Sequence, residues 1–163
     1  MSALRPVDMR TPLAAILLAL AACAYPLHGQ RTPTVTSVRG LAFGTLLPGV
    51  PLVVPPADAA RSAQFDIRVN NRGLALITFI LPPVMTGPAA TMPLSFGATS
   101  AGFSDTGSTA GMTLFDPRAP FTGTASTNGR ATIFLGGTAL PAGTQRAGSY
   151  TGTVTLTVAN VSI

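Results

Sequence analysis

Residues 135–161 of this 163-residue chain read LGGTALPAGTQRAGSYTGTVTLTVANV. From residue 150 to residue 158 two kinds of side chain alternate without a break, threonines on one face and mostly apolar residues on the other. Successive side chains of a β-strand point to opposite faces, so this alternation predicts a half-buried strand. Its predicted inward face consists of Tyr150, Gly152, Val154, Leu156 and Val158.

The composition of the whole chain favours many short strands joined by tight turns. Gly (17 residues) and Pro (15 residues) make up close to a fifth of it. No Lys or Glu is present, although helix surfaces normally draw on both. The net charge of +5 comes from Arg and Asp residues scattered along the chain. Nucleic-acid-binding proteins concentrate basic charge and interleave it with aromatic residues, so nucleic acid is not an expected partner.

Residues 1–30 have the pattern of an export signal. Arg5 and Arg10 precede an apolar run over residues 13–22, which is too short to span a bilayer core of about 30 Å. We therefore expect the protein to be exported to the periplasm or cell surface of a bacterium. Residues 31–163 are expected to form a single β-sandwich domain.

The processing of this signal has two interpretations. Ala22-Cys23-Ala24 offers a site for ordinary signal peptidase, and a cut nearer Gln30 is an alternative. Residues 20–23 (Leu-Ala-Ala-Cys) also have the form of a bacterial lipobox, in which Cys23 would be lipidated and become the first residue. A lipid on Cys23 is the one membrane contact that we expect.

Further short apolar or alternating segments, bounded by Gly, Pro and Asn, predict the remaining strands. They are residues 35–43, 52–54, 63–69, 74–81, 92–96, 112–115, 131–135 and 138–140. Residues 74–81 are apolar on both faces, which predicts a central strand, and Gly136-Gly137 predicts a bulge or bend. Residues 97–111 and 117–129 are expected to be loops. Seven to nine short strands without a helical period predict an all-β, immunoglobulin-like sandwich.

Several of these segments together resemble secreted pilin-like domains related to bacterial spore coat protein U. The resemblance covers roughly residues 35–161. The residues that carry it are Leu41-Ala42-Phe43-Gly44-Thr45 with Pro48-Gly49, Ala63-Gln64-Phe65-Asp66-Ile67, Leu81-Pro82, Leu135-Gly136-Gly137-Thr138, and residues 147–158. The chain departs from the family pattern in two ways. It lacks the cysteine pairs of the spore-coat-U branch, and it has Ala159-Asn160-Val161 where the family strand usually ends in an aromatic residue.

The resemblance implies a pilin-like sandwich that lacks its final strand. A periplasmic chaperone of a chaperone–usher system, and then a like subunit, would supply that strand by β-augmentation. Residues 150, 152, 154, 156 and 158 would form the edge beside the gap. The implied function is a non-enzymatic structural subunit of a surface fibre, pilus or coat. A self-complete, surface-attached binding or coat domain is the alternative. The short lead-in before Val35 counts against a full donor strand within the chain itself.

One motif points to an enzyme. Asp105-Thr106-Gly107-Ser108 matches the signature of aspartic proteases, in which two such loops of a dimer share one proton between their carboxylates. The preceding Phe103-Ser104 does not look like the apolar strand that would hold this loop rigid. We therefore interpret the motif as an Asx turn and expect no enzyme, with a homodimeric aspartic protease as the competing class.

Metal and cofactor chemistry have few candidate ligands in this sequence. His28 is the single histidine, Cys23 is the single cysteine, and there is no Glu. Zinc sites and Ser-His-Asp triads cannot be built from the remaining residues. A Ca²⁺ site that uses Asp and backbone carbonyls stays open as an interpretation. No cofactor is expected.

Overall fold

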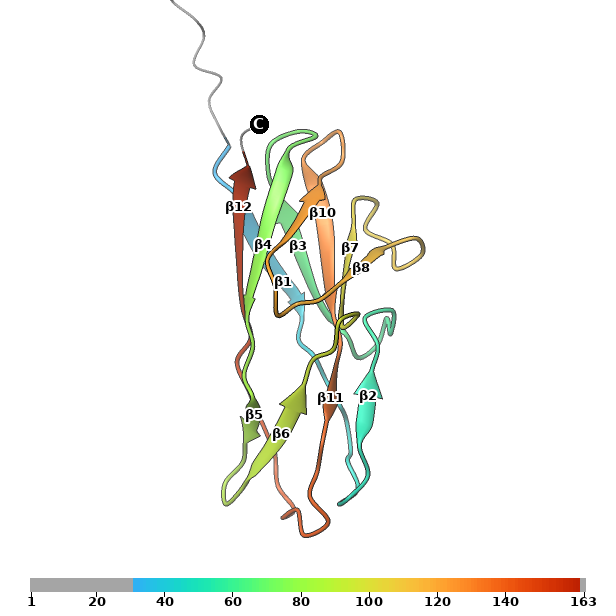
Figure 1. Cartoon of the computed structure of the whole chain (residues 1–163), viewed down its shortest axis with the longest axis vertical. Helices are drawn as coiled ribbons and strands as arrows, with labels where there is room; N and C mark the ends of the chain where they lie inside the picture. Colours follow the sequence, from blue (N-terminus) through green and yellow to red (C-terminus); the bar gives the residue numbers. More distant parts are fainter. Residues whose placement is uncertain (1–30, 162–163) are drawn as a thin grey trace, which may run out of the picture. The chain divides into compact units, whose positions relative to one another are not determined.

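The computed structural model of the chain describes residues 31–161, which form twelve β-strands and no helix (Figure 1). The strands are β1 (Thr34–Arg39), β2 (Leu52–Val54), β3 (Ala63–Arg68), β4 (Leu74–Ile80), β5 (Val84–Thr86), β6 (Thr91–Ser95), β7 (Ala101–Ser104), β8 (Thr113–Phe115), β9 (Phe121–Thr124), β10 (Arg130–Leu135), β11 (Gly137–Ala139) and β12 (Thr155–Val161). No helix in this part of the chain is long and apolar enough to cross a membrane. The predicted all-β sandwich is confirmed.

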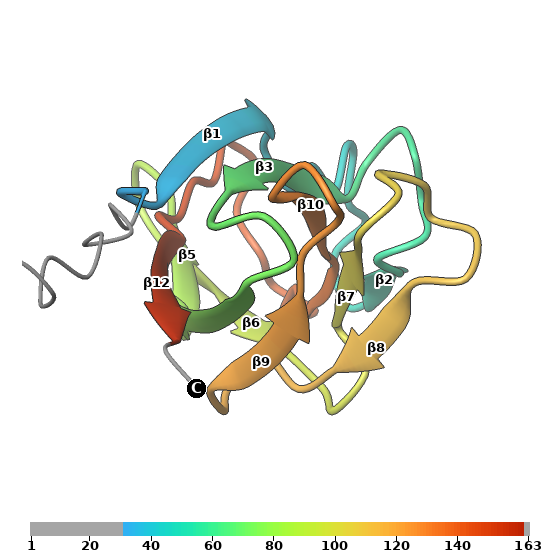
Figure 2. The ribbon, with the colours of Figure 1, turned by 90° about the horizontal axis from the view of Figure 1, so that it is seen from above.

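The strands form three antiparallel sheets. Two of them, with the orders β1-β3-β10-β7-β8 and β12-β4-β9, face each other as the two layers of a sandwich (Figure 2). The third sheet, β2-β11-β6-β5, lies below them in the view of Figure 1. We call these regions the upper and lower halves of the described chain. The predicted signal peptide and the lipobox at Cys23 lie outside the described residues.

Each half has its own hydrophobic core. In the upper half, inward-pointing residues of β3, β4 and β10 meet between the layers, and Ile67, Ile77 and Ile133 are each 1% exposed or less. Such burial contributes roughly 1.5–3 kcal/mol per large aliphatic side chain. The lower half has a smaller core, which consists of Phe43, Val54, Met85, Met92 and Ala139.

Gly136 lies where the chain leaves the five-stranded sheet at the end of β10 and enters the lower sheet at β11. Its N–H donates to the carbonyl of Ser100 (2.8 Å). A Cβ at this position would collide with the carbonyl oxygen of Val54, so the two backbones can approach this closely only at a glycine. The predicted bulge or bend is found here as a change of sheet.

The predicted number of strands, seven to nine, is too low. β7 lies inside the predicted loop 97–111, β9 lies inside the predicted loop 117–129, and β5 lies between two predicted strands. All four residues of β7 are buried between β10 and β8, although Ala101, Gly102 and Ser104 have small side chains with low strand propensity. In β9, Gly123 lies under the ring of Phe103, which leaves no room for a Cβ. Tertiary packing therefore overrides the low strand propensity of these segments.

The last strand is displaced from its predicted position, residues 150–158. The residues before Thr155 belong to the lower half, where Thr151 forms an isolated bridge with Thr86 of β5. Thr155 begins the ladder of β12 with β4. Between this ladder and the Thr151 bridge the chain passes Pro82, whose ring lies 3.3 Å from a Cβ built on Gly152. Proline has no N–H to donate to a ladder, so the ladder is interrupted there.

The outer face of β4 is less buried than its sequence indicates. β4 is the central strand of its sheet, and its inward residues are buried as expected. Its outward residues alternate with them and are only partly covered, and Ile80 is 68% exposed. The reason is that no second layer covers this side of the β12-β4-β9 sheet among the described residues.

Candidate strand-binding groove

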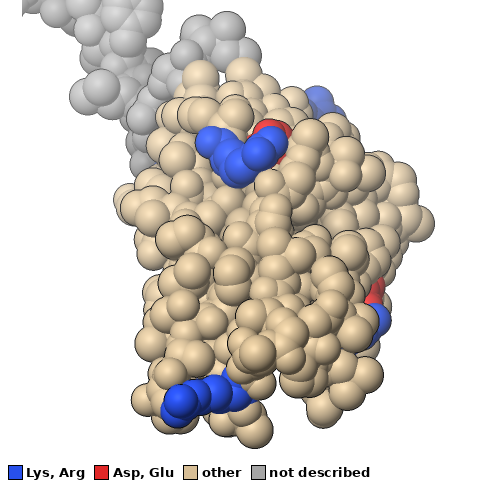
Figure 3. Space-filling view, turned by 60° about the horizontal axis from the view of Figure 1, so that its bottom comes forward, with Lys and Arg blue, Asp and Glu red and all other residues tan. Residues whose placement is uncertain are grey.

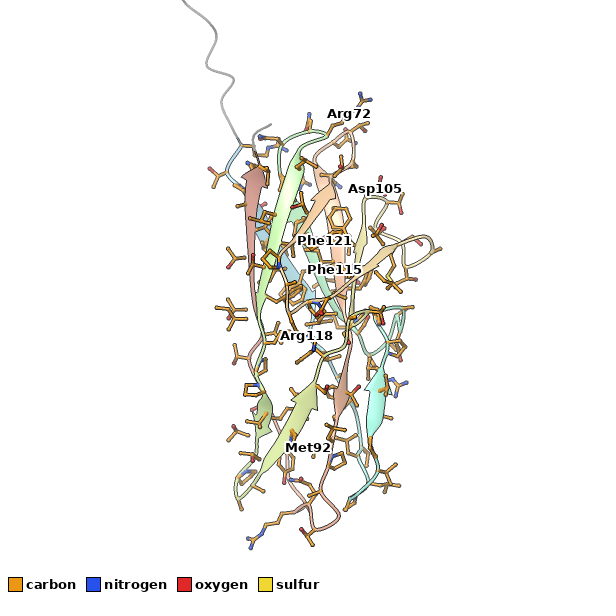
Figure 4. All side chains as sticks on the ribbon, in the orientation of Figure 1. Arg72, Met92, Asp105, Phe115, Arg118 and Phe121 are labelled. Carbon is orange, nitrogen blue, oxygen red and sulfur yellow. The ribbon has the colours of Figure 1, made fainter. Side chains whose placement is uncertain are left out.

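The sandwich has two seams, where the edges of its layers meet, and one of them is closed. The chain crosses directly from β8 to β9 through Asp116–Pro120 at this seam. The ring of Phe115 stacks on that of Phe121 with centroids 4.1 Å apart, and Phe121 also packs against Phe103 at 5.7 Å (Figure 4). Aromatic pairs at these separations contribute more than their buried area alone.

The opposite seam, between β1 and β12, has no such closure. The two strands are neighbours in Figure 2, but no ladder pairs them. All residues of β1 except Arg39 are exposed, because the strand pairs with β3 on one side and with no described strand on the other. The side of β12 away from β4 likewise pairs with no strand of residues 31–161.

Two adjoining hollows follow this open seam into the lower half. Their volumes are about 610 and 290 Å³, and both are lined by Leu41, Phe43, Met85 and Tyr150. We call this continuous feature the groove. Residues 37–48 form one wall and residues 145–154 form the other. The floor of the groove is apolar. It includes Phe65, Leu94 and Phe96 in the smaller hollow, which we call the upper hollow, and Met92 in the larger one, the lower hollow.

Both walls carry backbone groups without partners in the described chain. On the first wall, the N–H of Ala42 donates to the carbonyl of Arg61 (2.9 Å), whereas Leu41 and Phe43 form no backbone hydrogen bond with a described residue. On the second wall, Thr151 exchanges two hydrogen bonds with Thr86, whereas Gly152 forms none with any residue of 31–161. Such rows of free N–H and C=O groups are the template that an added strand uses.

Hydrogen bonds hold the second wall at the lower end of the groove. The Tyr150 hydroxyl donates to the carbonyl of Arg146 (2.7 Å) and accepts from Nε2 of Gln145 (2.7 Å). Gln145 also donates to the carbonyl of Thr91 on β6 (3.2 Å). The ring of Tyr150 is thereby fixed against the lower core and forms part of the apolar lining.

The groove is almost free of charge. Of its lining residues only Arg146 is charged, and few charged side chains appear on the face shown in Figure 3. The ion pairs among the described residues, Asp58 with Arg61 and Asp116 with Arg118, involve no residue of the groove lining. An apolar segment bound in the groove would therefore bury few charged groups.

The residues that the sequence predicts as an assembly edge lie in two different places. Tyr150, Gly152 and Val154 line the groove. Leu156 and Val158 instead pack against the upper core. Leu41 and Phe43 on the facing wall were not predicted as site residues, although both belong to the motif that carries the family resemblance.

The protease motif at residues 105–108 directly follows a β-strand. Phe103 and Ser104 belong to β7, a buried strand, so the expectation that no strand precedes the motif is wrong. Asp105 is exposed at the end of this strand (Figure 4). No described side chain or backbone group hydrogen-bonds its carboxylate, so the interpretation of the motif as an Asx turn at Asp105 is wrong. The Ser108 Oγ instead accepts from the N–H of Ala110 (3.1 Å), and Thr106 pairs with Ser104 (3.1 Å). The described residues also contain no group of three Asp, Glu, His or Cys placed to hold a metal ion.

Comparison of the sequence with protein-family models gives no match, and comparison with curated proteins gives none.

Proposed function

We propose that this chain is a non-enzymatic structural subunit of a bacterial surface fibre, pilus or coat. In this proposal an extended strand from another polypeptide occupies the groove and completes the sandwich. A periplasmic chaperone and then a like subunit supply that strand. Export to the periplasm or cell surface follows from the signal pattern of residues 1–30, with Cys23 either removed or lipidated.

One observation carries the proposal: the apolar groove is bordered on both sides by backbone groups without partners. An inserted strand satisfies both requirements at once. Its alternate side chains cover Leu41, Tyr150 and Val154, which are only partly buried in the free chain, and its backbone pairs with the two walls, as in β-augmentation. A small-molecule ligand would cover the apolar surface but leave most of the wall amides unpaired.

A self-complete surface domain remains the second candidate, and a specific observation favours it. The upper core is closed around Ile67, Ile77 and Ile133 without any added strand. Among the described residues no buried side-chain polar atom lacks a hydrogen-bond partner. In this case the chain would be a stable monomer, and the groove would serve as a binding site or remain solvated.

Thermal unfolding with a synthetic strand separates the two candidates. The chain is heated alone and with a peptide of about eight alternating apolar and polar residues, which is long enough to pair with residues 149–154 of the second wall. The control peptide has the same composition with its apolar residues in one block. The subunit proposal predicts that the alternating peptide alone raises the unfolding temperature, by about 5 °C or more at saturation. An equal response to both peptides, or none, favours the self-complete domain.

A further inference from the structure

Just below the lower hollow the two chain segments are joined, because the N–H of Gly49 donates to the carbonyl of Ala142 (3.0 Å). Above this bond, no hydrogen bond joins residues 44–48 to residues 146–149. At the upper end neither hollow extends past Ser37 on one wall or Val154 on the other. Beyond these residues β1 and β12 approach each other (Figures 1 and 2).

Asn160 ties the two sides of the seam together above the groove. Its Nδ2 donates to the carbonyl of Arg31, which leads into β1, at 2.6 Å. Its Oδ1 accepts from the N–H of Asn70 (3.2 Å). The Oδ1 of Asn70 in turn accepts from the N–H of Arg31 (2.9 Å). These three hydrogen bonds, which we call the Asn160 clamp, join the end of β12, the turn after β3 and the entry to β1.

We propose that the Asn160 clamp is the upper stop of the groove and sets the length and register of the strand that the groove accepts. This inference rests on the proposed function, because it presupposes that a strand binds. Above the bend at residues 147–148, the wall over residues 149–154 is about 17 Å long at roughly 3.3 Å per residue. A bound strand therefore pairs over about six residues and cannot continue along β12 while the clamp holds β1 beside it.

The position of the clamp explains why it acts on register. A strand slides easily in a uniform slot, because every two-residue shift restores the same facing of side chains. A closed end removes this freedom, since a shift upward runs into the clamp and a shift downward loses paired residues. Asn160 is thus a positioning residue, which does not line either hollow.

The test measures how peptide affinity depends on peptide length, in the full chain. Alternating peptides of about eight and about twelve residues are titrated against the unaltered chain, Asn160→Ala and Asn160→Asp. The Asp variant keeps an oxygen for the Asn70 N–H but removes the donor to Arg31, so it opens the clamp with the least disturbance. Asn71→Ala is the matched control, because Asn71 is exposed and forms no side-chain hydrogen bond with a described residue.

In the unaltered chain and in Asn71→Ala, we expect the two peptides to bind within about twofold of each other. In both Asn160 variants the longer peptide is expected to bind at least about tenfold more tightly, because the added residues can pair along β12. Equal length dependence in all four proteins would overturn the clamp inference while leaving the subunit proposal intact. If no alternating peptide binds the unaltered chain, the proposed function itself fails.

Discussion

Val35 of β1 and Ile67 of β3 lie directly opposite each other in an antiparallel pair, so both side chains point into the sandwich. Ile67 is 1% exposed, whereas Val35 is 39% exposed. The difference arises because Ile67 has a second neighbour, Ala131 of β10, and Val35 has no described strand on its other side. The exposure of this inward-pointing valine shows that, above the groove, β1 and β12 lie beside each other without covering the seam.

Filling the groove from within should stabilise the chain and block strand binding. Ser37 points inward opposite Phe65 and lines the upper hollow, whereas Thr36 on the same strand points outward opposite Asp66. We expect Ser37→Leu to raise the free energy of unfolding by about 1 kcal/mol through partial burial of its side chain. Thr36→Leu should change it by less than about 0.5 kcal/mol. Denaturant titration measures both, and a stabilised Ser37→Leu variant that still responds fully to the strand peptide would argue against the groove as the binding site.

The two seams should respond differently to truncation. Phe121→Ala removes a ring that packs on Phe115 and Phe103 in the closed seam, and we expect it to cost about 3 kcal/mol. Leu41→Ala in the open groove should cost only about 1 kcal/mol in the free chain, because this side chain is only partly buried there. With the strand peptide bound, the cost of Leu41→Ala should rise while that of Phe121→Ala stays constant. Equal changes for both variants would show that the peptide acts elsewhere.

The change of sheet after β10 should depend on Gly136. Gly136→Ala places a Cβ against the carbonyl of Val54, and we expect a loss of more than about 2 kcal/mol in unfolding free energy. The control is Gly143→Ala, where no heavy atom lies within 4 Å of the added Cβ and the change should stay below about 0.5 kcal/mol. Similar stabilities of the two variants would contradict the close backbone contact at Gly136.

The corner between β8 and β9 should weaken in acid. Arg118 hydrogen-bonds the side chain of Asp116 and lowers the pKa of this carboxyl from 3.8 to about 2. Between these values the unfolded chain binds the proton more readily, so the pair stabilises the fold above about pH 4, and this contribution is lost as the pH falls towards 2. Asp116→Asn should therefore flatten the dependence of unfolding temperature on pH in this window. Asp105→Asn is the control, because Asp105 takes part in no ion pair of the described chain, and an unchanged pH profile in Asp116→Asn would refute the assignment.

Most of the fold could be predicted from the sequence because several strands alternate cleanly. β3 and β12 carry period-two patterns, and their predicted inward faces are buried in β3 and partly buried in β12. The buried strand β7 could not be recognised, since Ala101 and Gly102 owe their extended conformation to the neighbours β10 and β8 and not to their own propensity.

The groove could be predicted only in part, for a related reason. The pattern over residues 150–158 marks one wall correctly at Tyr150, Gly152 and Val154. The facing wall at Leu41 and Phe43 lies inside the predicted strand 35–43, which in the structure ends at Arg39. Nothing in the sequence indicates that these two residues face the wall at Tyr150. The Asn160 clamp depends on residues 31, 70 and 160, whose proximity arises only when the sandwich forms.

The measurement that tests the central claim most directly is residue-resolved amide hydrogen exchange of the chain, with and without the alternating peptide. The account predicts that the amides of Leu41, Phe43 and Gly152 exchange quickly in the free chain and become protected together when the peptide binds, while Ile77 in β4 is protected in both states. If these wall amides are already protected in the free chain, or stay unprotected with saturating peptide, the groove does not accept a strand and the subunit proposal is wrong.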